Sequence, residues 1–148
     1  MKQIKLLNNQ TYFKPILKIV NVEGERKFKS PPMRYLLLHR LEDIADNYRD
    51  LCKYIIKNKI SEIDKNIIDY YEKTNLMLRI LYDFYYKLDI DLGDKILYEK
   101  DNLLAKADDI TKKVSKEQLP IFVLLRQIVY IIAEAASPIY TILFDQNQ

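Results

Sequence analysis

The chain has 148 residues, of which 49% are apolar and 30% charged, with only two glycines and five prolines. This length allows one domain with a hydrophobic core, and the scarcity of turn residues together with apolar residues at helical spacing predicts an all-α protein. The formal net charge of +3 does not by itself indicate a polyanionic partner.

Five helices are predicted in chain order, at Asn9–Val20, Ser30–Asn58, Ser61–Leu88, Asp94–Lys113 and Leu119–Phe144. Pro31 and Pro32 suit the first turn of the second helix, where a missing N–H is harmless. The pairs Ser61 with Asp64 and Ser115 with Gln118 predict capping boxes, and the stretch from Asp89 to Gly93 breaks the helical pattern. Long helices joined by short loops predict an antiparallel up-down bundle, with the second and fifth helices near its centre.

The second helix divides into two faces. Six apolar residues fall on one side: Leu37, Leu41, Ile44, Tyr48, Leu51 and Ile55. The opposite side carries Glu42 and Asp46, one turn apart, and like charges at that spacing cost roughly 0.2–0.5 kcal/mol. Either a metal ion or cationic partner binds there, or the face is solvated and Arg49 and Lys53 offset its charge. His39 either adds an imidazole ligand or pairs with Glu42 on the surface.

The last helix contains only two charged residues, Arg126 and Glu134, within its 26 positions. It is long enough to span a membrane, but each charge would cost about 2.5–3.5 kcal/mol near a bilayer centre. We therefore favour a buried bundle helix without membrane insertion. Its polar stripe consists of Arg126, Tyr130, Glu134, Ser137 and Thr141. This stripe is either a polar seam facing the first half of the chain or an Arg126–Glu134 arrangement satisfied by neighbouring helices.

An internal repeat is visible when the chain is shifted by 88 positions. Identical residues then coincide at Pro32 and Pro120, Leu36–Leu37 and Leu124–Leu125, and Ile44–Ala45 and Ile132–Ala133. Asp46 coincides with Glu134, whereas Glu42 coincides with Tyr130. The pattern predicts a duplicated hairpin whose second copy keeps half of the carboxylate pair.

The phrase RYLLLHRLEDIADNYRDLCKYI resembles the third helix of the PhoU family of phosphate-uptake regulators. The matching residues are Leu41, Glu42, Ile44, Ala45 and Asp46. Asp43 replaces the usual arginine, and Asn47 stands where a histidine is frequent. Upstream, NNQTYFKPILKIV is similar to the end of the preceding family helix, and SPP is similar to the loop between them.

This resemblance implies a single domain over residues 1–148, built from spectrin-like three-helix repeats. Residues 1–58 would form a partial first repeat and residues 61–145 a complete second one. By the resemblance, Glu42, Asp46 and Glu134 would bind iron or zinc. The protein would be a non-enzymatic regulator of phosphate uptake that contacts a transporter or signalling protein. The alternative is a general helical interaction or dimerisation module that lacks the metal site.

Other functions find less support in the sequence. No Gly-rich phosphate loop or Cys/His cluster is present, and His39 and Cys52 lie on different helix faces, so we expect no enzyme. The basic run between residues 26 and 40 is short and is followed by carboxylates, which disfavours nucleic acid. A single cysteine at the edge of an apolar face and the lack of a signal-peptide pattern in MKQIKLLNNQ predict a cytoplasmic protein.

We also expect a homodimer. Residues 1–60 carry 13 Lys and Arg against 6 Asp and Glu, a net of +7, and residues 61–148 carry 11 against 15, a net of −4. Unlike halves favour association with a second copy of the chain. Five helices would also leave part of the apolar last helix uncovered in a monomer.

Overall fold

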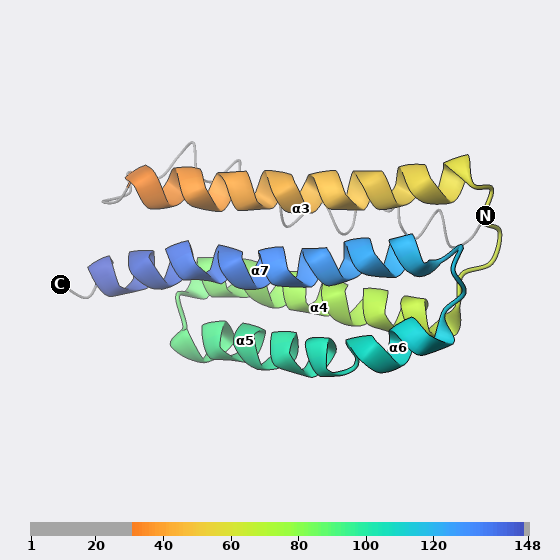
Figure 1. Cartoon of the computed structure of the whole chain (residues 1–148). Coiled ribbons are helices and arrows are strands. Elements are labelled where there is room, and N and C mark those ends of the chain that lie inside the picture. The colour runs from red at the N-terminus through yellow and green to blue at the C-terminus, as the bar shows by residue number, and fades with distance from the viewer. Residues whose placement is uncertain (1–30, 147–148) are drawn as a thin grey trace.

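The computed structural model describes residues 31–146, and within this range every regular element is a helix. The helices are α3 (Pro31–Lys57), α4 (Lys65–Lys87), α5 (Ile90–Ala105), α6 (Ala107–Lys113) and α7 (Leu119–Gln146). The long helices alternate in direction along one axis (Figure 1). The predicted all-α class is confirmed for this part of the chain, whereas the helix predicted at Asn9–Val20 lies outside the described residues.

The core of the bundle forms around α7. This helix contacts each of the other described helices, and Ile128, Val129 and Ile132 are completely buried in it. By contrast, α3 packs mainly along α7 and lies at one edge of the described part (Figure 1). The prediction of a central position is therefore confirmed for the last helix, and for α3 it is not met within residues 31–146. The reason is that α7 is apolar around most of its circumference, whereas α3 has one apolar stripe.

The buried stripe of α3 is the one that its periodicity predicts. Each of its six members is at most 3% exposed: Leu37, Leu41, Ile44, Tyr48, Leu51 and Ile55. Tyr48 also donates a hydrogen bond of 2.6 Å from its hydroxyl to Oδ1 of the buried Asn75 in α4. The stripe thus attaches α3 to α7 and to α4, with the charged face of α3 turned outward.

The start of α4 differs from the prediction. The N-cap is Asp64, whose Oδ1 accepts a hydrogen bond of 2.8 Å from the backbone N–H of Asn66, and Ser61 precedes the helix without capping it. Asp64 is the better cap here because its backbone is held in place. Its N–H donates to Oε1 of Gln118 at 2.8 Å, and the Gln118 amide donates to the carbonyl of Glu62 at 2.9 Å.

Gln118 was expected in a capping box with Ser115, and only half of that box forms. Oγ of Ser115 accepts from the Gln118 backbone N–H at 3.4 Å, while the Gln118 side chain crosses to the α3–α4 loop. Nearby, the Tyr54 hydroxyl donates to the carbonyl of Glu117 at 2.7 Å. Two loops far apart in sequence are therefore joined at one end of the bundle.

The predicted break from Asp89 to Gly93 is shorter in the structure. Leu88 adopts a left-handed conformation with φ of 50°, Asp89 caps the next helix, and α5 begins at Ile90. Gly93 consequently lies inside α5, where its backbone packs against α7 and α4. A Cβ at this position would lie 2.5 Å from Cζ of Tyr140 and 2.8 Å from Cζ of Phe84. Gly93 is needed for close packing rather than for a turn.

The fourth predicted helix is divided in two at Lys106, between α5 and α6. Of the described helices, only α7 is long and apolar enough to cross a membrane by length and composition. Half of its most apolar window is buried inside the bundle, and the core helix of a soluble protein passes the same test.

Candidate functional site

Glu42 and Asp46 lie on the exposed face of α3, as their spacing predicts. The Asp46 carboxylate accepts from Nη1 of Arg49 at 2.9 Å, and this pair is more than half exposed. Arg49 thus offsets one of the two like charges, as the solvated alternative requires. The Glu42 side chain forms no ion pair with a described residue.

Glu134 finds its partner on a neighbouring helix. Its Oε2 lies 3.3 Å from Nε of Arg40, which reaches from α3 across to α7. Nη1 of the same arginine lies 3.3 Å from Oδ2 of Asp43. The alternative in which neighbouring helices satisfy Arg126 and Glu134 is therefore confirmed for Glu134. Arg126 and Glu134 are eight residues apart on α7, whereas Arg40 reaches Glu134 from the neighbouring helix.

His39 also differs from expectation. Its Nε2 lies 3.9 Å from Oδ2 of Asp43, one turn along α3, rather than beside Glu42. Among residues 31–146 no three His, Cys, Asp or Glu side chains lie close enough to hold a metal ion. Glu42, Asp46 and Glu134 thus do not form a ready-made three-ligand site, and their role as metal ligands stays a prediction.

Cys52 and His39 lie 13 residues apart on α3, which is about 20 Å along the helix axis. Cys52 is half-buried beside the core, and burial raises the pKa of its thiol. A raised pKa keeps the thiol protonated and unreactive at neutral pH. Cys52 therefore has the properties of a packing residue, as the sequence predicts.

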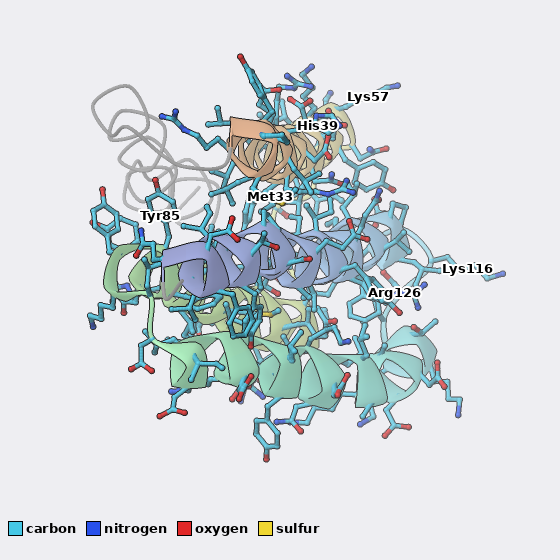
Figure 2. All side chains as sticks on the ribbon, turned by 90° about the vertical axis from the view of Figure 1, so that its left-hand side faces the viewer. Met33, His39, Lys57, Tyr85, Lys116 and Arg126 are labelled. Atoms are coloured by element: carbon cyan, nitrogen blue, oxygen red, sulfur yellow. The ribbon has the colours of Figure 1, made fainter. Side chains whose placement is uncertain are left out.

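The polar stripe of α7 lies on the surface and not in a seam. A row of residues spaced alternately by four and three positions runs along this side, and we call it the α7 row: Val123, Gln127, Tyr130, Glu134, Ser137, Thr141 and Phe144. Within it, Val123 is 47% exposed, Tyr130 46% and Phe144 54%. Arg126 extends from the same helix at the outer surface of the bundle (Figure 2). The row gives α7 an accessible face between α3 and α5.

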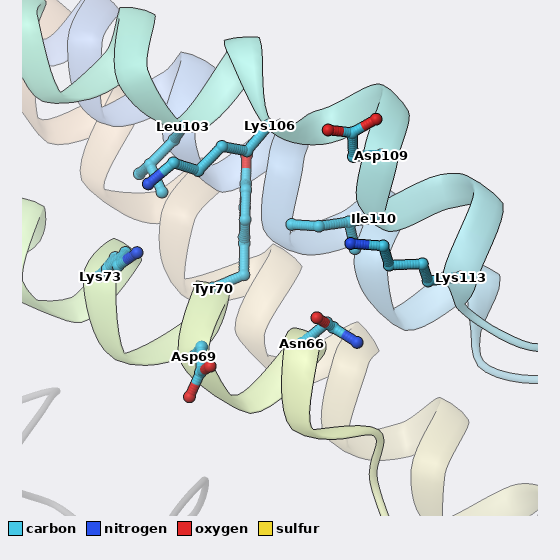
Figure 3. A pocket seen from close by; sticks show the side chains of 9 residues that line it. All are labelled: Asn66, Asp69, Tyr70, Lys73, Leu103, Lys106, Asp109, Ile110 and Lys113. Carbon is cyan, nitrogen blue, oxygen red and sulfur yellow. The ribbon is translucent and has the colours of Figure 1, made fainter.

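A second concave feature lies on another side of the molecule. A pocket of about 210 Å³ opens between α4 and the α5–α6 junction, and its lining includes Tyr70 and the lysines Lys73, Lys106 and Lys113 (Figure 3). Tyr70 forms its wall and packs its ring edgewise on Phe122, with centroids 4.9 Å apart. The sequence gives no signal for this pocket, because its lysines come from α4, the α5–α6 junction and α6 and form no local pattern.

Comparisons with protein-family models, with curated proteins and with solved structures find no match to this chain. Its class is therefore given by the structure itself, as an all-helical bundle centred on α7. The resemblance to phosphate-uptake regulators stays a prediction from ten or so residues of α3.

Proposed function

We propose that this protein is a non-enzymatic regulatory adaptor that acts by binding protein through the α7 row. The observation that supports this function is the regularity of the row. Single exposed apolar residues are normal on soluble proteins. In the α7 row, however, half-exposed Val123, Tyr130 and Phe144 recur at the spacing by which helices pair, along the most apolar described helix.

A second copy of the chain suits the α7 row because the row is complementary to itself when reversed. Glu134 lies at its midpoint, so two antiparallel rows place Val123 against Phe144 of the second copy and Tyr130 against Ser137. Apolar groups then meet at the ends, and a large residue meets a small one near the centre. The existing contact of Glu134 with Arg40, at 3.3 Å, offsets repulsion between the two carboxylates at the twofold axis.

The test of this dimer is the mass in solution. Analytical ultracentrifugation should give twice 17.7 kDa for the native chain. Ser137→Arg inserts a bulky charge into the row and should weaken dimerisation by at least about tenfold, or roughly 1.4 kcal/mol. Tyr98→Arg is the matched control, because Tyr98 is 65% exposed on α5 outside the row. A single 17.7 kDa species for the native chain at about 100 μM would reject the proposal.

The register of the pair can be tested by disulfide formation. In a Cys52→Ser background, Glu134→Cys places one thiol beside its copy at the twofold axis and should crosslink under mild oxidation. Gln127 is also exposed, but Gln127→Cys meets Thr141 of the second copy, so it should stay uncrosslinked. Equal crosslinking of the two variants would contradict the antiparallel pairing.

The sequence resemblance extends the proposal to regulation of phosphate uptake, through contact with a transporter or signalling protein in the cytoplasm. The exposed Glu42, without an ion pair to a described residue, favours the metal-binding form of this function. Asp46 would be the second ligand and would exchange its contact with Arg49 for the metal. Two carboxylates do not complete a site, so Glu134 or groups from a second molecule must supply the rest.

Metal analysis of the purified protein tests this form. Stoichiometric iron or zinc should be bound by the native chain and lost in the double variant Glu42→Ala, Asp46→Ala. Glu72→Ala, on the exposed side of α4, should retain the metal. If the native chain, the double variant and Glu72→Ala had the same metal content, Glu42 and Asp46 would not be metal ligands.

A further inference from the structure

The pocket between α4 and the α5–α6 junction has an unusual charge arrangement. It is lined by Lys73 of α4, Lys106 of the junction and Lys113 of α6, and none of these lysines forms an ion pair with a described residue. In Figure 3 their side chains extend over the pocket from two sides. The carboxylates of Asp69 and Asp109, which belong to the same lining, point away from it in this view. Three lysines against two aspartates leave the lining with a net positive charge, which attracts an anion.

A second observation at the pocket concerns a buried hydroxyl. Tyr70 is 2% exposed, and its hydroxyl oxygen has no hydrogen-bond partner among the described residues. The aliphatic part of Lys106 crosses in front of this hydroxyl in Figure 3. A buried hydroxyl without a partner is unfavourable, and an acceptor oxygen brought beside it by a shift of the Lys106 side chain would satisfy it.

Tyr70 stays a hydrogen-bond donor under all ordinary conditions. Burial raises the pKa of Tyr70 to about 12, with a smaller opposing effect from the charge of Arg126. The phenol is thus neutral at physiological pH. Asn66 lies at the other side of the pocket and supplies an amide, whose N–H₂ is a further donor.

From these groups we propose that the pocket binds a phosphate group, either as inorganic phosphate or as a phosphate monoester. Lys73, Lys106 and Lys113 would neutralise its charge, and Tyr70 and Asn66 would donate hydrogen bonds to its oxygens. A tetrahedral phosphate presents several acceptor oxygens to donors that surround it, whereas a carboxylate presents two in one plane. The volume of about 210 Å³ exceeds the share of several water molecules and leaves room for an ester group.

This site is separate from the α7 row and from Glu42, so its test is independent of the adaptor function. Binding is measured on the whole chain by titration calorimetry in a phosphate-free buffer, with inorganic phosphate, glycerol phosphate and acetate at matched ionic strength. The two phosphates should saturate one site at about 0.1–1 mM, and acetate should bind at least about tenfold more weakly. If glycerol phosphate binds more tightly than inorganic phosphate, the natural ligand is a phosphate monoester. If the two bind equally, the site recognises the phosphate group alone and the ligand is free phosphate.

Variants decide whether the pocket itself is responsible. Lys106→Gln and Lys113→Gln should each weaken phosphate binding by about tenfold. Lys112→Gln removes the same charge from α6 outside the pocket lining and should change binding less than about twofold. A general effect of surface charge would weaken all three alike, and that result would overturn the proposal.

Tyr70→Phe separates binding from folding. The hydroxyl has no partner without the ligand, so its removal should leave the melting temperature unchanged or higher. The same change should weaken phosphate binding by about five- to tenfold. Failure of both phosphates to bind at about 10 mM, or full affinity in Tyr70→Phe, would show that the pocket does not recognise phosphate as proposed.

Discussion

Replacing Gly93 by alanine should change the free energy of unfolding through two opposing effects. Alanine in a helix interior is favoured over glycine by about 1 kcal/mol, so secondary-structure propensity predicts stabilisation. The packing predicts the opposite, because the new Cβ would lie 2.5 Å from Cζ of Tyr140 and 2.8 Å from Cζ of Phe84. Relieving this overlap requires the Tyr140 ring to move away from α5. Such overpacking of a filled core costs about 1–3 kcal/mol.

Movement of Tyr140 has a further cost. Its hydroxyl donates to Oδ1 of Asp94 at 2.6 Å, one residue from the glycine, so the ring cannot shift without straining that hydrogen bond. This contact is solvent-exposed, and we assign it the typical net value of a hydrogen bond, about 1 kcal/mol. Adding the packing and hydrogen-bond losses and subtracting the propensity gain leaves a net destabilisation of about 1–3 kcal/mol. For a chain of this size that lowers the melting temperature by roughly 3–10 °C.

Urea unfolding followed by far-UV circular dichroism measures the change directly. The control is the same substitution in a Tyr140→Ala background, where the main obstacle is gone. There Gly93→Ala should be nearly neutral or stabilising, which gives a coupling energy of at least about 1 kcal/mol between the two positions. If Gly93→Ala were as stable as the native chain, the close approach of α5 to α7 would be wrong.

Two further predictions concern buried hydroxyl groups. Tyr48→Phe removes the 2.6 Å hydrogen bond to Asn75, whose Nδ2 already lacks a partner among the described residues, and should cost about 1–3 kcal/mol by urea unfolding. Adding Asn75→Leu should recover part of that loss. A double variant with a lower free energy of unfolding than Tyr48→Phe alone would contradict this. For Tyr70, the folded pKa of about 12 exceeds the usual value near 10, so ionisation disfavours the folded state. Through Tyr70 alone, the free energy of unfolding should fall by about 2–3 kcal/mol between pH 10 and 12. In Tyr70→Phe, the decrease over this pH range should be smaller by that amount.

The helices themselves follow largely from local sequence. The six apolar positions of α3 repeat at helical spacing and are all buried, and the prolines at residues 31 and 32 lie in its first turn. These features depend on residues within one or two turns of each other, so they can be recognised without knowledge of the rest of the chain. The long apolar segment from Leu119 likewise identifies the helix around which the others pack.

Tertiary structure decided the features that depend on neighbours far apart in sequence. The sequence predicts a break in the helical pattern from Asp89 to Gly93, but the approach of Tyr140 explains Gly93 as a packing residue inside α5. Glu134 pairs with Arg40, because helix packing brings α3 beside this part of α7. Arg126 lies on the same helix as Glu134 but eight residues away. The lysines around Tyr70 come together only when the α5–α6 junction packs against α4. Helical periodicity sets which face of each helix is apolar, whereas the identity of the residues that meet across faces is set by how the helices pack.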